Sequence, residues 1–531
     1  MTTKNTYAII PNMGNHIRTV EEKSYVKNSV GRLIFAIFAL ALEIIVLAAF
    51  AHRLQVGGIF RIVERILALF LVLIIYNQEK TSSVKVPWII LILIFPIFGA
   101  VLYLIIGLSG ATKKMRKRYE YIDAKLYPHL PPQPEEIMHR EIADRSVANV
   151  SEYIHKNAFY PMYENTDVEF YGYASDALEA QKAELAKAQH FIFMEYHAIE
   201  DAEAFHQIER ILIDRVRHGV EVRLFYDDVG SIAFIDKNFI KQMRKIGIKC
   251  RVFNPLTPLI NAFLNNRDHR KITVIDGKVA FTGGYNLANE YFNITHPYGF
   301  WKDTGIKVTG DAVKSFTVMF LEMWNAIRGT DKDDVNLEKY LDTVPYTARE
   351  RCLVQPYADN PIDNEQVGEN VYISLIERAE TYIYFMTPYL ILTDEMVHAL
   401  GLAAKRGVDV RIITPGIPDK KMVYRMTKAN YKALVLEGVR IFEYTPGFCH
   451  AKQCVSDDSV AVCGTINLDY RSLYHHFENA CLIYGSRSVL DMKADFTRTF
   501  EVSEEVTHKY THRSFIFGIW CIVMKLFAPL M

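Results

Sequence analysis

The sequence has little cysteine and no excess of either charge. Its seven cysteines are scattered, and none forms a CxxC pair or has the Cys/His spacing of a metal site. This excludes a disulfide framework and a structural zinc site, and it favours reduced thiols in a domain that faces the cytosol. Lysine plus arginine and aspartate plus glutamate both total 61. The net charge therefore indicates no polyanionic partner. Charged partners can be inferred only from local clusters of basic or acidic residues.

The N-terminal region is the most apolar part of the chain, and we expect no cleaved signal peptide there. Its first apolar segment starts late, and no small-residue cleavage pattern follows it. Segments 33–51 and 86–106 are each long enough to span a bilayer, whereas the apolar run 66–76 spans only with the charged residues before it. We predict an N-terminal tail (1–32) and a membrane region (33–107) with two or three transmembrane helices.

A basic run, KKMRKR (113–118), follows the last predicted span. By the positive-inside rule it puts the downstream chain in the cytoplasm. Near an anionic surface each of its basic residues contributes about 1 kcal/mol. At the other end, segment 514–531 is strongly apolar with one lysine, which is typical of an interfacial helix. We expect a multi-pass protein of the cell membrane whose large soluble part faces the cytoplasm.

The middle of the chain is duplicated. The pattern HxKxxxxD occurs twice, and each copy is followed after the same gap by G-x-x-N. The copies are offset by 450 − 269 = 181 residues. One such motif is weak evidence, but two with the same trailing turn exclude chance. The repeated positions are His269, Lys271, Asp276, Gly283 and Asn286 in the first copy, and His450, Lys452, Asp457, Gly464 and Asn467 in the second.

Each copy is predicted to alternate helices and apolar strands before a hairpin that carries the motif, so the fold class is α/β, with two sandwich repeats. At 531 residues the chain is too long for one compact domain. We predict a basic, Pro-containing linker (108–149), a first domain (150–330), a second linker (331–365), a second domain (366–512) and the apolar C-terminal segment (513–531). About ten extra apolar residues precede the first histidine, and they suit acyl chains.

The motif points to phosphate chemistry. Side chains alternate along a strand, so His269 and Lys271 point the same way. If the two copies meet about a pseudo-twofold axis, two histidines, two lysines and two asparagines surround one point. Lysine ammonium and asparagine amide groups suit phosphate oxygens, and no carboxylate cluster is present to hold a metal. One neutral histidine can attack phosphorus to form a phosphohistidine, while the other, protonated, donates to the leaving oxygen and then deprotonates an incoming hydroxyl.

The other motif positions are expected to support this pair. Asp276 and Asp457 complete the catalytic motifs but fall in hairpin turns, so we expect them to support the fold. Asp303 and Glu478 follow the two motifs at comparable distances and are the predicted carboxylates that orient the histidines. The neighbouring His475 and His476 are expected to be packing or surface residues. The predicted substrate-binding positions are Asn286, Asn467, Gly283, Gly464 and Thr465.

The doubled motif resembles the phospholipase D superfamily, and the segments GFWKDTG, GTINLDYRS and FEN resemble bacterial cardiolipin synthases. The resemblance implies phospholipase D-like repeats that transfer a phosphatidyl group between two phosphatidylglycerol molecules, giving cardiolipin and glycerol without a cofactor. It also implies that His269 is the nucleophile and His450 the acid and base. The sequence departs from the family at Lys302 and Gly305, which replace an arginine and a histidine, and at Gly284, which replaces a serine. These changes are expected at the rim of the site.

Other functions share these residues. A phospholipase D-type hydrolase would use water as the acceptor, and a lipid-binding scaffold would keep a relic site. A nuclease would carry a basic, aromatic-lined groove, and no such run flanks either motif, so we expect no nucleic acid partner. The expected partners are phosphatidylglycerol and anionic membrane lipid. The acceptor and a homo-oligomeric state are left open by the sequence.

Overall fold

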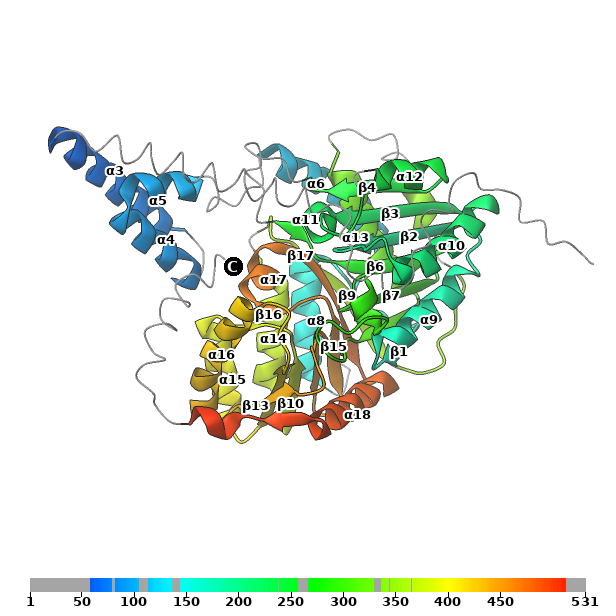
Figure 1. Cartoon of the computed structure of the whole chain (residues 1–531). Helices are drawn as coiled ribbons and strands as arrows, with labels where there is room; N and C mark the ends of the chain where they lie inside the picture. Colours follow the sequence, from blue (N-terminus) through cyan, green and yellow to red (C-terminus); the bar gives the residue numbers. More distant parts are fainter. Residues whose placement is uncertain are drawn as a thin grey trace, which may run out of the picture.

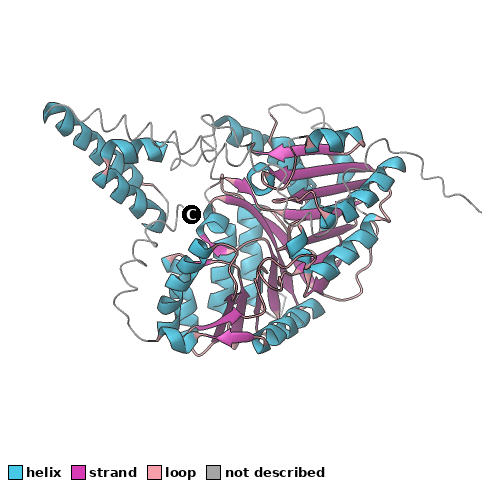
Figure 2. Cartoon of the chain, in the orientation of Figure 1, coloured by secondary structure: helices cyan, strands magenta, loops and turns pink. Residues whose placement is uncertain are grey.

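The computed structural model describes residues 58–78, 82–104, 113–135, 144–236, 238–255, 266–328, 336–342, 344–363 and 365–511. Two mixed sheets, one from each copy, form the body of the molecule, with helices packed on both (Figures 1 and 2). The predicted tail 1–32, span 33–51, extra apolar residues around 256–265 and apolar segment 514–531 lie outside the described residues.

The first half contains a seven-stranded sheet in the order β1-β8-β7-β6-β2-β3-β4. Its strands are β1 (Thr166–Tyr171), β2 (Phe191–Tyr196), β3 (Glu221–Asp227), β4 (Lys249–Phe253), β6 (Lys271–Ile275), β7 (Val279–Gly283) and β8 (Gly305–Gly310), and β5 (Arg267–Asp268) pairs elsewhere. Its helices are α8 (Arg145–Ala158), α9 (Ala174–Leu185), α10 (Glu203–Arg217), α11 (Asp228–Ser231), α12 (Phe239–Lys245) and α13 (Val313–Ala326).

The second half repeats this order as β9-β17-β15-β14-β10-β12-β13, with β18 added beyond β13 and β5 beyond β17. Its strands are β9 (Leu353–Asp359), β10 (Tyr382–Met386), β11 (Leu390–Ile391), β12 (Asp409–Pro415), β13 (Arg440–Tyr444), β14 (Gln453–Ser456), β15 (Val460–Gly464), β16 (Leu468–Asp469), β17 (His476–Tyr484) and β18 (Ser503–Glu505). Its helices are α14 (Val367–Arg378), α15 (Asp394–Lys405), α16 (Lys421–Leu436), α17 (Tyr470–Tyr474) and α18 (Arg487–Glu501). The predicted duplicated α/β fold is confirmed.

Alternation along the strands explains how the layers pack. In β2, Ile192 and Met194 join a core with α9, α10 and α12, whereas Phe193 faces a second core with α8 and α13. This second core continues into the second half, so both sheets share it. A side chain that points out of one core therefore enters the other, which is why most strand residues are buried.

Strand β9 lies within the segment 331–365 that the sequence assigned to a linker. It pairs with β17 along its whole length, from Glu478↔Asp359 to Tyr484↔Leu353. Pro356 interrupts its sequence pattern, and proline argues against a strand wherever a ladder hydrogen bond is needed. The second half therefore begins before the predicted boundary at 366.

The N-terminal helices stand apart from the two sheets (Figure 1). They are α3 (Gly58–Tyr76), α4 (Ser82–Ile94) and α5 (Pro96–Leu102). Within the ranges given above, no helix combines the length and apolarity needed to cross a membrane. The uninterrupted span expected at 86–106 is not observed, because Pro96 starts a new helix after Phe95, and Gly99 packs closely against the backbone of Ile92.

Among the described residues, helices α4 and α6 (Lys113–Leu126) join the N-terminal part to the body. Val84 of α4 packs against Ile391, Met426 and Tyr470 of the second half. The predicted basic run opens α6. This helix packs on α13, where Arg118 donates to the carbonyl of Asn325 at 3.1 Å. The basic run is therefore part of a helix docked on the body.

Candidate active site

The two motif histidines lie at the junction of the halves. His269 and His450 are 7% and 6% exposed, and each precedes a hairpin strand, β6 or β14. The backbone N–H of His269 donates to Phe477 O at 2.9 Å, and that of His450 donates to Lys302 O at 2.7 Å. Each motif is thus anchored on the other half of the chain, reciprocally, as expected for a pseudo-twofold arrangement.

The orienting carboxylates are exchanged between the halves. His269 Nδ1 lies 2.9 Å from both carboxylate oxygens of Glu478, and His450 Nδ1 lies 2.7 Å from Oδ2 of Asp303. The exchange follows from backbone pairing. Strand β5, just before His269, pairs with the start of β17, and Lys302, just before Asp303, forms an isolated β-bridge with Cys449. The sequence identified these four residues, but it assigned no carboxylate to a particular histidine.

The two motif lysines are buried beside the histidines. Lys271 Nζ donates to the His269 carbonyl at 2.7 Å, and Lys452 Nζ lies 2.8 and 2.9 Å from the two ring nitrogens of His450. Burial lowers the pKa of Lys271 to about 8 and that of Lys452 to about 7. Burial and then the neighbouring lysines hold the pKa of both histidines well below the usual value. A bound phosphate group would favour the charged forms of these lysines and histidines, because a nearby anion opposes the effect of burial.

The two carboxylates have unequal surroundings. Glu478 accepts from the hydroxyls of Thr465 at 2.5 Å and Ser472 at 2.6 Å. Asp303 accepts from the Thr304 backbone at 2.9 Å, and burial raises the pKa of Asp303 to about 7. At the position that matches Thr465 the first half has Gly284, where any Cβ would overlap Asp303. The glycine that replaces the family's serine therefore makes room for the carboxylate.

The two histidine rings also face different neighbours. Around His450 stand Tyr291, Trp301 and Phe448, with ring centroids 5.2, 5.4 and 5.8 Å away. Around His269 stand His197 and His476, at 5.0 and 5.4 Å. His476, predicted to be a packing or surface residue, packs with its ring against that of His269 and therefore lies inside the site.

Alignment of the two copies gives the signal that would have found these neighbours. Tyr291 and Ser472 each come five residues after the motif asparagine, and Trp301 and His476 each come two residues before the carboxylate. No comparable pair of equivalent positions in the two copies identifies His197. One half of the site is thus lined by aromatic rings, and the other by polar and titratable groups.

The asparagines and glycines lie around the same centre. Asn286 accepts from the Ala198 backbone at 3.1 Å and donates to the Tyr291 hydroxyl at 2.9 Å. Asn467 Oδ1 is buried without a hydrogen-bond partner among the described residues. Gly283 and Gly464 end β7 and β15, where a Cβ would overlap the neighbouring strand. The glycines therefore serve close strand packing.

The motif aspartates lie at the far turns of their hairpins, away from the histidines. Both have left-handed backbones, with φ 53 at Asp276 and 52 at Asp457. Asp276 accepts from three consecutive backbone N–H groups at 2.7–2.8 Å, at the start of β2. Asp457 does the same at the start of β10, at 2.8–3.0 Å. This geometry matches the fold-supporting role that the sequence predicted.

The substitutions expected at the rim lie inside the structure. Lys302 Nζ pairs with both oxygens of Asp495 in α18, at 2.7 and 2.8 Å, and joins the two halves. Gly305 begins β8, where a Cβ would lie 2.6 Å from the Tyr285 ring. Both residues are therefore structural.

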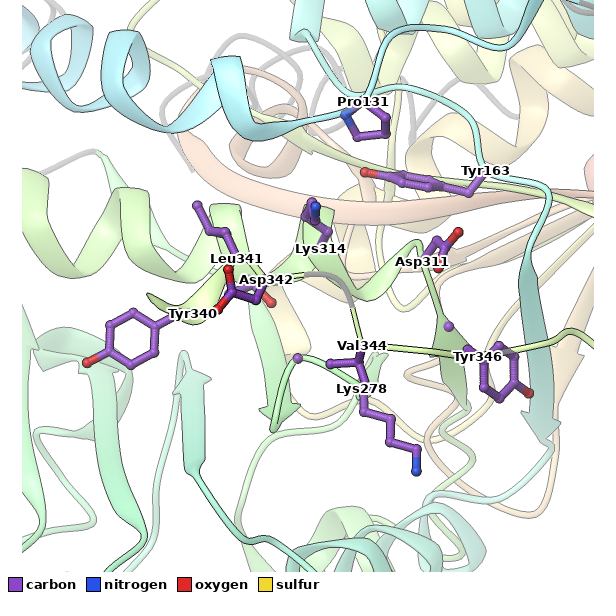
Figure 3. A pocket seen from close by; sticks show the side chains of 13 residues that line it. Pro131, Tyr163, Lys278, Asp311, Lys314, Tyr340, Leu341, Asp342, Val344 and Tyr346 are labelled. Carbon is purple, nitrogen blue, oxygen red and sulfur yellow. The ribbon is translucent and has the colours of Figure 1, made fainter. Parts of the chain in front are cut away.

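Two cavities lie elsewhere. The first, about 120 Å³, is lined by Lys278, Lys314, Tyr340 and Tyr346 at the turn end of the β6–β7 hairpin (Figure 3). The second, about 290 Å³, is lined by Arg270, Glu322 and Asp123. Neither has a motif histidine in its lining. Separately, ligand atoms of His269, His476 and Glu478 lie within 4.8 Å of one another, a spacing that a metal ion can use.

Comparisons with known proteins agree with this geometry. The family described as "Cardiolipin synthase, PLD-like domain" matches residues 182–324 and 372–500. The family "Phospholipase D-nuclease N-terminal" matches residues 66–107. An uncharacterized protein of Streptococcus mutans is 41% identical over 87% of this chain and 99% of its own length.

Named relatives and a solved structure give the same picture. A cardiolipin synthase of Halalkalibacterium halodurans is 28% identical, over 89% of this chain and 94% of its own. Cardiolipin synthase 2 of Bacillus cereus is 30% identical, over 83% and 85%. The fold is similar to that of phosphatidylserine synthase of Haemophilus influenzae, with a TM-score of 0.54 and 15% identity over 72% of this chain and 97% of that one. The chain belongs to the bacterial cardiolipin synthase family of the phospholipase D superfamily and is a phospholipase D-type phosphatidyltransferase.

Proposed function

We propose that the enzyme transfers the phosphatidyl group of one phosphatidylglycerol to a hydroxyl of a second, giving cardiolipin and glycerol. The observation that carries this proposal is the pair of exchanged histidine–carboxylate contacts beside two buried lysines. The names of the relatives agree with it. The two lysines and two asparagines would hold the non-bridging phosphate oxygens.

In the first half-reaction, Nε2 of neutral His269 attacks phosphorus and the bond from phosphorus to the glycerol oxygen breaks. The pKa of His450 is held well below its usual value in the free site, so the anionic phosphodiester is needed to favour its protonated form. His450 then gives its Nε2 proton to that oxygen, and glycerol leaves. The bond from His269 to phosphorus puts a positive charge on the imidazole ring. Glu478, whose negative charge is stabilised by two hydroxyl hydrogen bonds, accepts the Nδ1–H bond and balances it.

In the second half-reaction, neutral His450 takes the proton of the acceptor hydroxyl. The acceptor oxygen attacks phosphorus, the bond to His269 breaks, and cardiolipin forms. A pKa of Asp303 raised to about 7 suits the role of His450 as a base. A carboxylate with this pKa holds the Nδ1 proton of His450 more readily than an ordinary carboxylate does. The aromatic rings around His450 exclude water, which favours a lipid hydroxyl as the acceptor.

A lipid surface next to the N-terminal helices would supply both substrates. In α3, the side chains of Ile66, Leu67 and Phe70 are 60–63% exposed, which is unusual for large apolar groups in water. We propose that this face contacts acyl chains, and that the basic start of α6 keeps the catalytic halves on the cytoplasmic side.

The test uses the full chain in liposomes that contain phosphatidylglycerol as the lipid substrate. Cardiolipin and glycerol should appear together at equal rates, and His269→Asn and His450→Asn should abolish both. His218→Asn, at a side chain 62% exposed, is the matched control and should retain full activity. Phosphatidic acid and glycerol without cardiolipin would instead assign a lipid hydrolase.

A further inference from the structure

On one side of the site, three side chains are gathered around a single buried carboxylate oxygen. His269 Nδ1 and His476 Nδ1 lie 2.9 and 3.6 Å from the same atom, Oε1 of Glu478. One possible ligand atom from each of the three residues lies within 4.8 Å of the other two. Two imidazole rings and a carboxylate can therefore reach one point beside His269.

The spacing fits a metal ion of the Zn²⁺ class. Zn²⁺ binds imidazole nitrogen at about 2.0–2.1 Å and carboxylate oxygen at about 2.0–2.2 Å, so two ligands of one tetrahedral ion lie about 3.4 Å apart. The two distances to Glu478 Oε1 lie on either side of this value. Two histidines and one glutamate are also a set that zinc uses with its fourth position open. Mg²⁺ and Ca²⁺ prefer oxygen ligands and do not suit two imidazoles.

The surroundings of His476 give a second, independent observation. Its Nδ1 is buried and has no hydrogen-bond partner among the residues that the structure describes. Such a buried polar atom is uncommon, and an ion is one of the partners that can satisfy it. The side chains of His269 and His476 are 9% and 12% exposed, so an ion can reach them, whereas Glu478 is fully buried.

The neighbours orient the carboxylate and leave three ligands. The Ser472 hydroxyl donates to Oε1 of Glu478 at 2.6 Å, and outer-shell bonds of this kind fix the orientation of a metal ligand. His197 also lies beside the site, but its Nδ1 is 2.7 Å from the carbonyl oxygen of Asp268, and it does not belong to the group of three.

Among the described residues, the first half has no matching cluster. Trp301 occupies the position that corresponds to His476, since each comes two residues before the orienting carboxylate. The indole N–H is a donor only and cannot bind a metal ion. Of the two motif histidines, only His269 therefore lies in a set of metal ligands.

We propose that His269, His476 and Glu478 bind a divalent ion of the Zn²⁺ class, and that this ion reversibly switches the enzyme off. The ion would take the place of the proton between His269 Nδ1 and Glu478. A neutral imidazole with a metal on Nδ1 carries its proton on Nε2, so the nitrogen that attacks phosphorus has no free lone pair. The inhibition rests on the proposed function, whereas binding of the ion does not.

The first test measures binding to the full chain in detergent, with Co²⁺ as a coloured substitute for Zn²⁺. The unaltered protein should give visible absorption bands of bound Co²⁺, and Zn²⁺ should abolish them. His476→Phe should weaken Co²⁺ binding about 100-fold, since loss of even an outer-shell partner costs about 10–100-fold. Zn²⁺ should also raise the thermal midpoint of the unaltered protein and not that of folded His476→Phe, which separates loss of the site from misfolding.

The second test measures inhibition in phosphatidylglycerol liposomes. Zn²⁺ should stop the release of glycerol, EDTA should restore it, and Mg²⁺ or Ca²⁺ at the same concentration should have no effect. Relative to its own metal-free rate, His476→Phe should tolerate about 100-fold more Zn²⁺. His475→Phe is the matched control, because it removes the adjacent histidine, which lies outside the group of three, and it should respond to Zn²⁺ like the unaltered enzyme.

The outcomes separate the site, the switch and the proposed function. Equal Co²⁺ affinity in His476→Phe and the unaltered protein would overturn the site. Zn²⁺ binding at this site without loss of glycerol release would overturn the switch. Absence of cardiolipin from the metal-free, unaltered enzyme would overturn the proposed function, and the Co²⁺ spectra would still decide whether the site exists.

Discussion

Two buried lysines should respond in opposite ways to the same substitution. Lys302 and Lys452 are 2% and 1% exposed. Lys302 is paired with both oxygens of Asp495, whereas Lys452 faces His450 and lies close to the carboxylate of Asp303 as well as to the cationic Lys271. We expect Lys302→Met to destabilise the protein, because it leaves the buried Asp495 without its cation. We expect Lys452→Met to stabilise it, because the pKa of the neighbouring Asp303 is already raised to about 7 and this carboxylate can bind a proton when the lysine is removed.

The magnitudes follow from the surroundings. A pKa of Lys452 lowered from 10.5 to about 7 corresponds to a penalty of at most about 5 kcal/mol for carrying the charge at pH 7. Loss of the contacts to His450 offsets part of this gain, so we expect a net stabilisation of about 2 kcal/mol. Breaking the pair of Lys302 with Asp495 should cost about 3–5 kcal/mol.

The assay is thermal unfolding of the full chain in detergent, at pH 7 and without phosphate. The midpoint should rise by several degrees for Lys452→Met and fall for Lys302→Met, and Lys452→Met should be inactive. Added phosphate should stabilise the unaltered protein more than Lys452→Met. A fall of the midpoint in both variants would refute the reasoning, since it would mean that the charge of Lys452 is already balanced in the free enzyme.

Three further predictions use other parts of the site. Glu478→Gln should slow formation of the phosphohistidine about 10³-fold, because a buried charge partner worth about 4 kcal/mol is lost, and rapid-quench trapping would measure it; a loss below tenfold would exclude the charge role. The pKa values of Lys271 and Lys452, about 8 and 7, lie below the 10.5 of an unfolded lysine. The folded protein therefore binds fewer protons between about pH 7 and 10.5, and its free energy of unfolding should rise with pH in this window, so urea titrations that show a fall would contradict these values. EDTA should not reduce the rate, whereas Zn²⁺ should inhibit by binding His269, His476 and Glu478; His476→Phe should relieve the inhibition, and equal inhibition of that variant would exclude the site.

The sequence predicted which residues form the site better than it predicted the contacts among them. Two copies of one motif with a constant offset sufficed to place His269, His450, Asp303 and Glu478 at one centre. The exchange of carboxylates depends on β5, a strand of two residues that pairs with β17 about two hundred residues away. No local pattern reports so short and so distant a contact.

The remaining differences have local physical causes. Strand β9 was not predicted because Pro356 lies within it, although β9 pairs with β17 along its whole length. Pro96 divided a segment whose hydropathy alone predicted one span. The contact of His476 with His269 was not predicted, because nothing in the immediate sequence of His476 shows that β17 carries it against that ring.

The central claim is that His269 carries the phosphatidyl group and His450 moves the proton. The most direct measurement is acid-free quenching of the enzyme with phosphatidylglycerol labelled in its phosphate, followed by digestion and mass spectrometry of the labelled peptide. Our account predicts a phosphatidylated His269 in the unaltered enzyme and none in His269→Asn. Label on His450, or turnover to cardiolipin with no covalent adduct on either histidine, would contradict it.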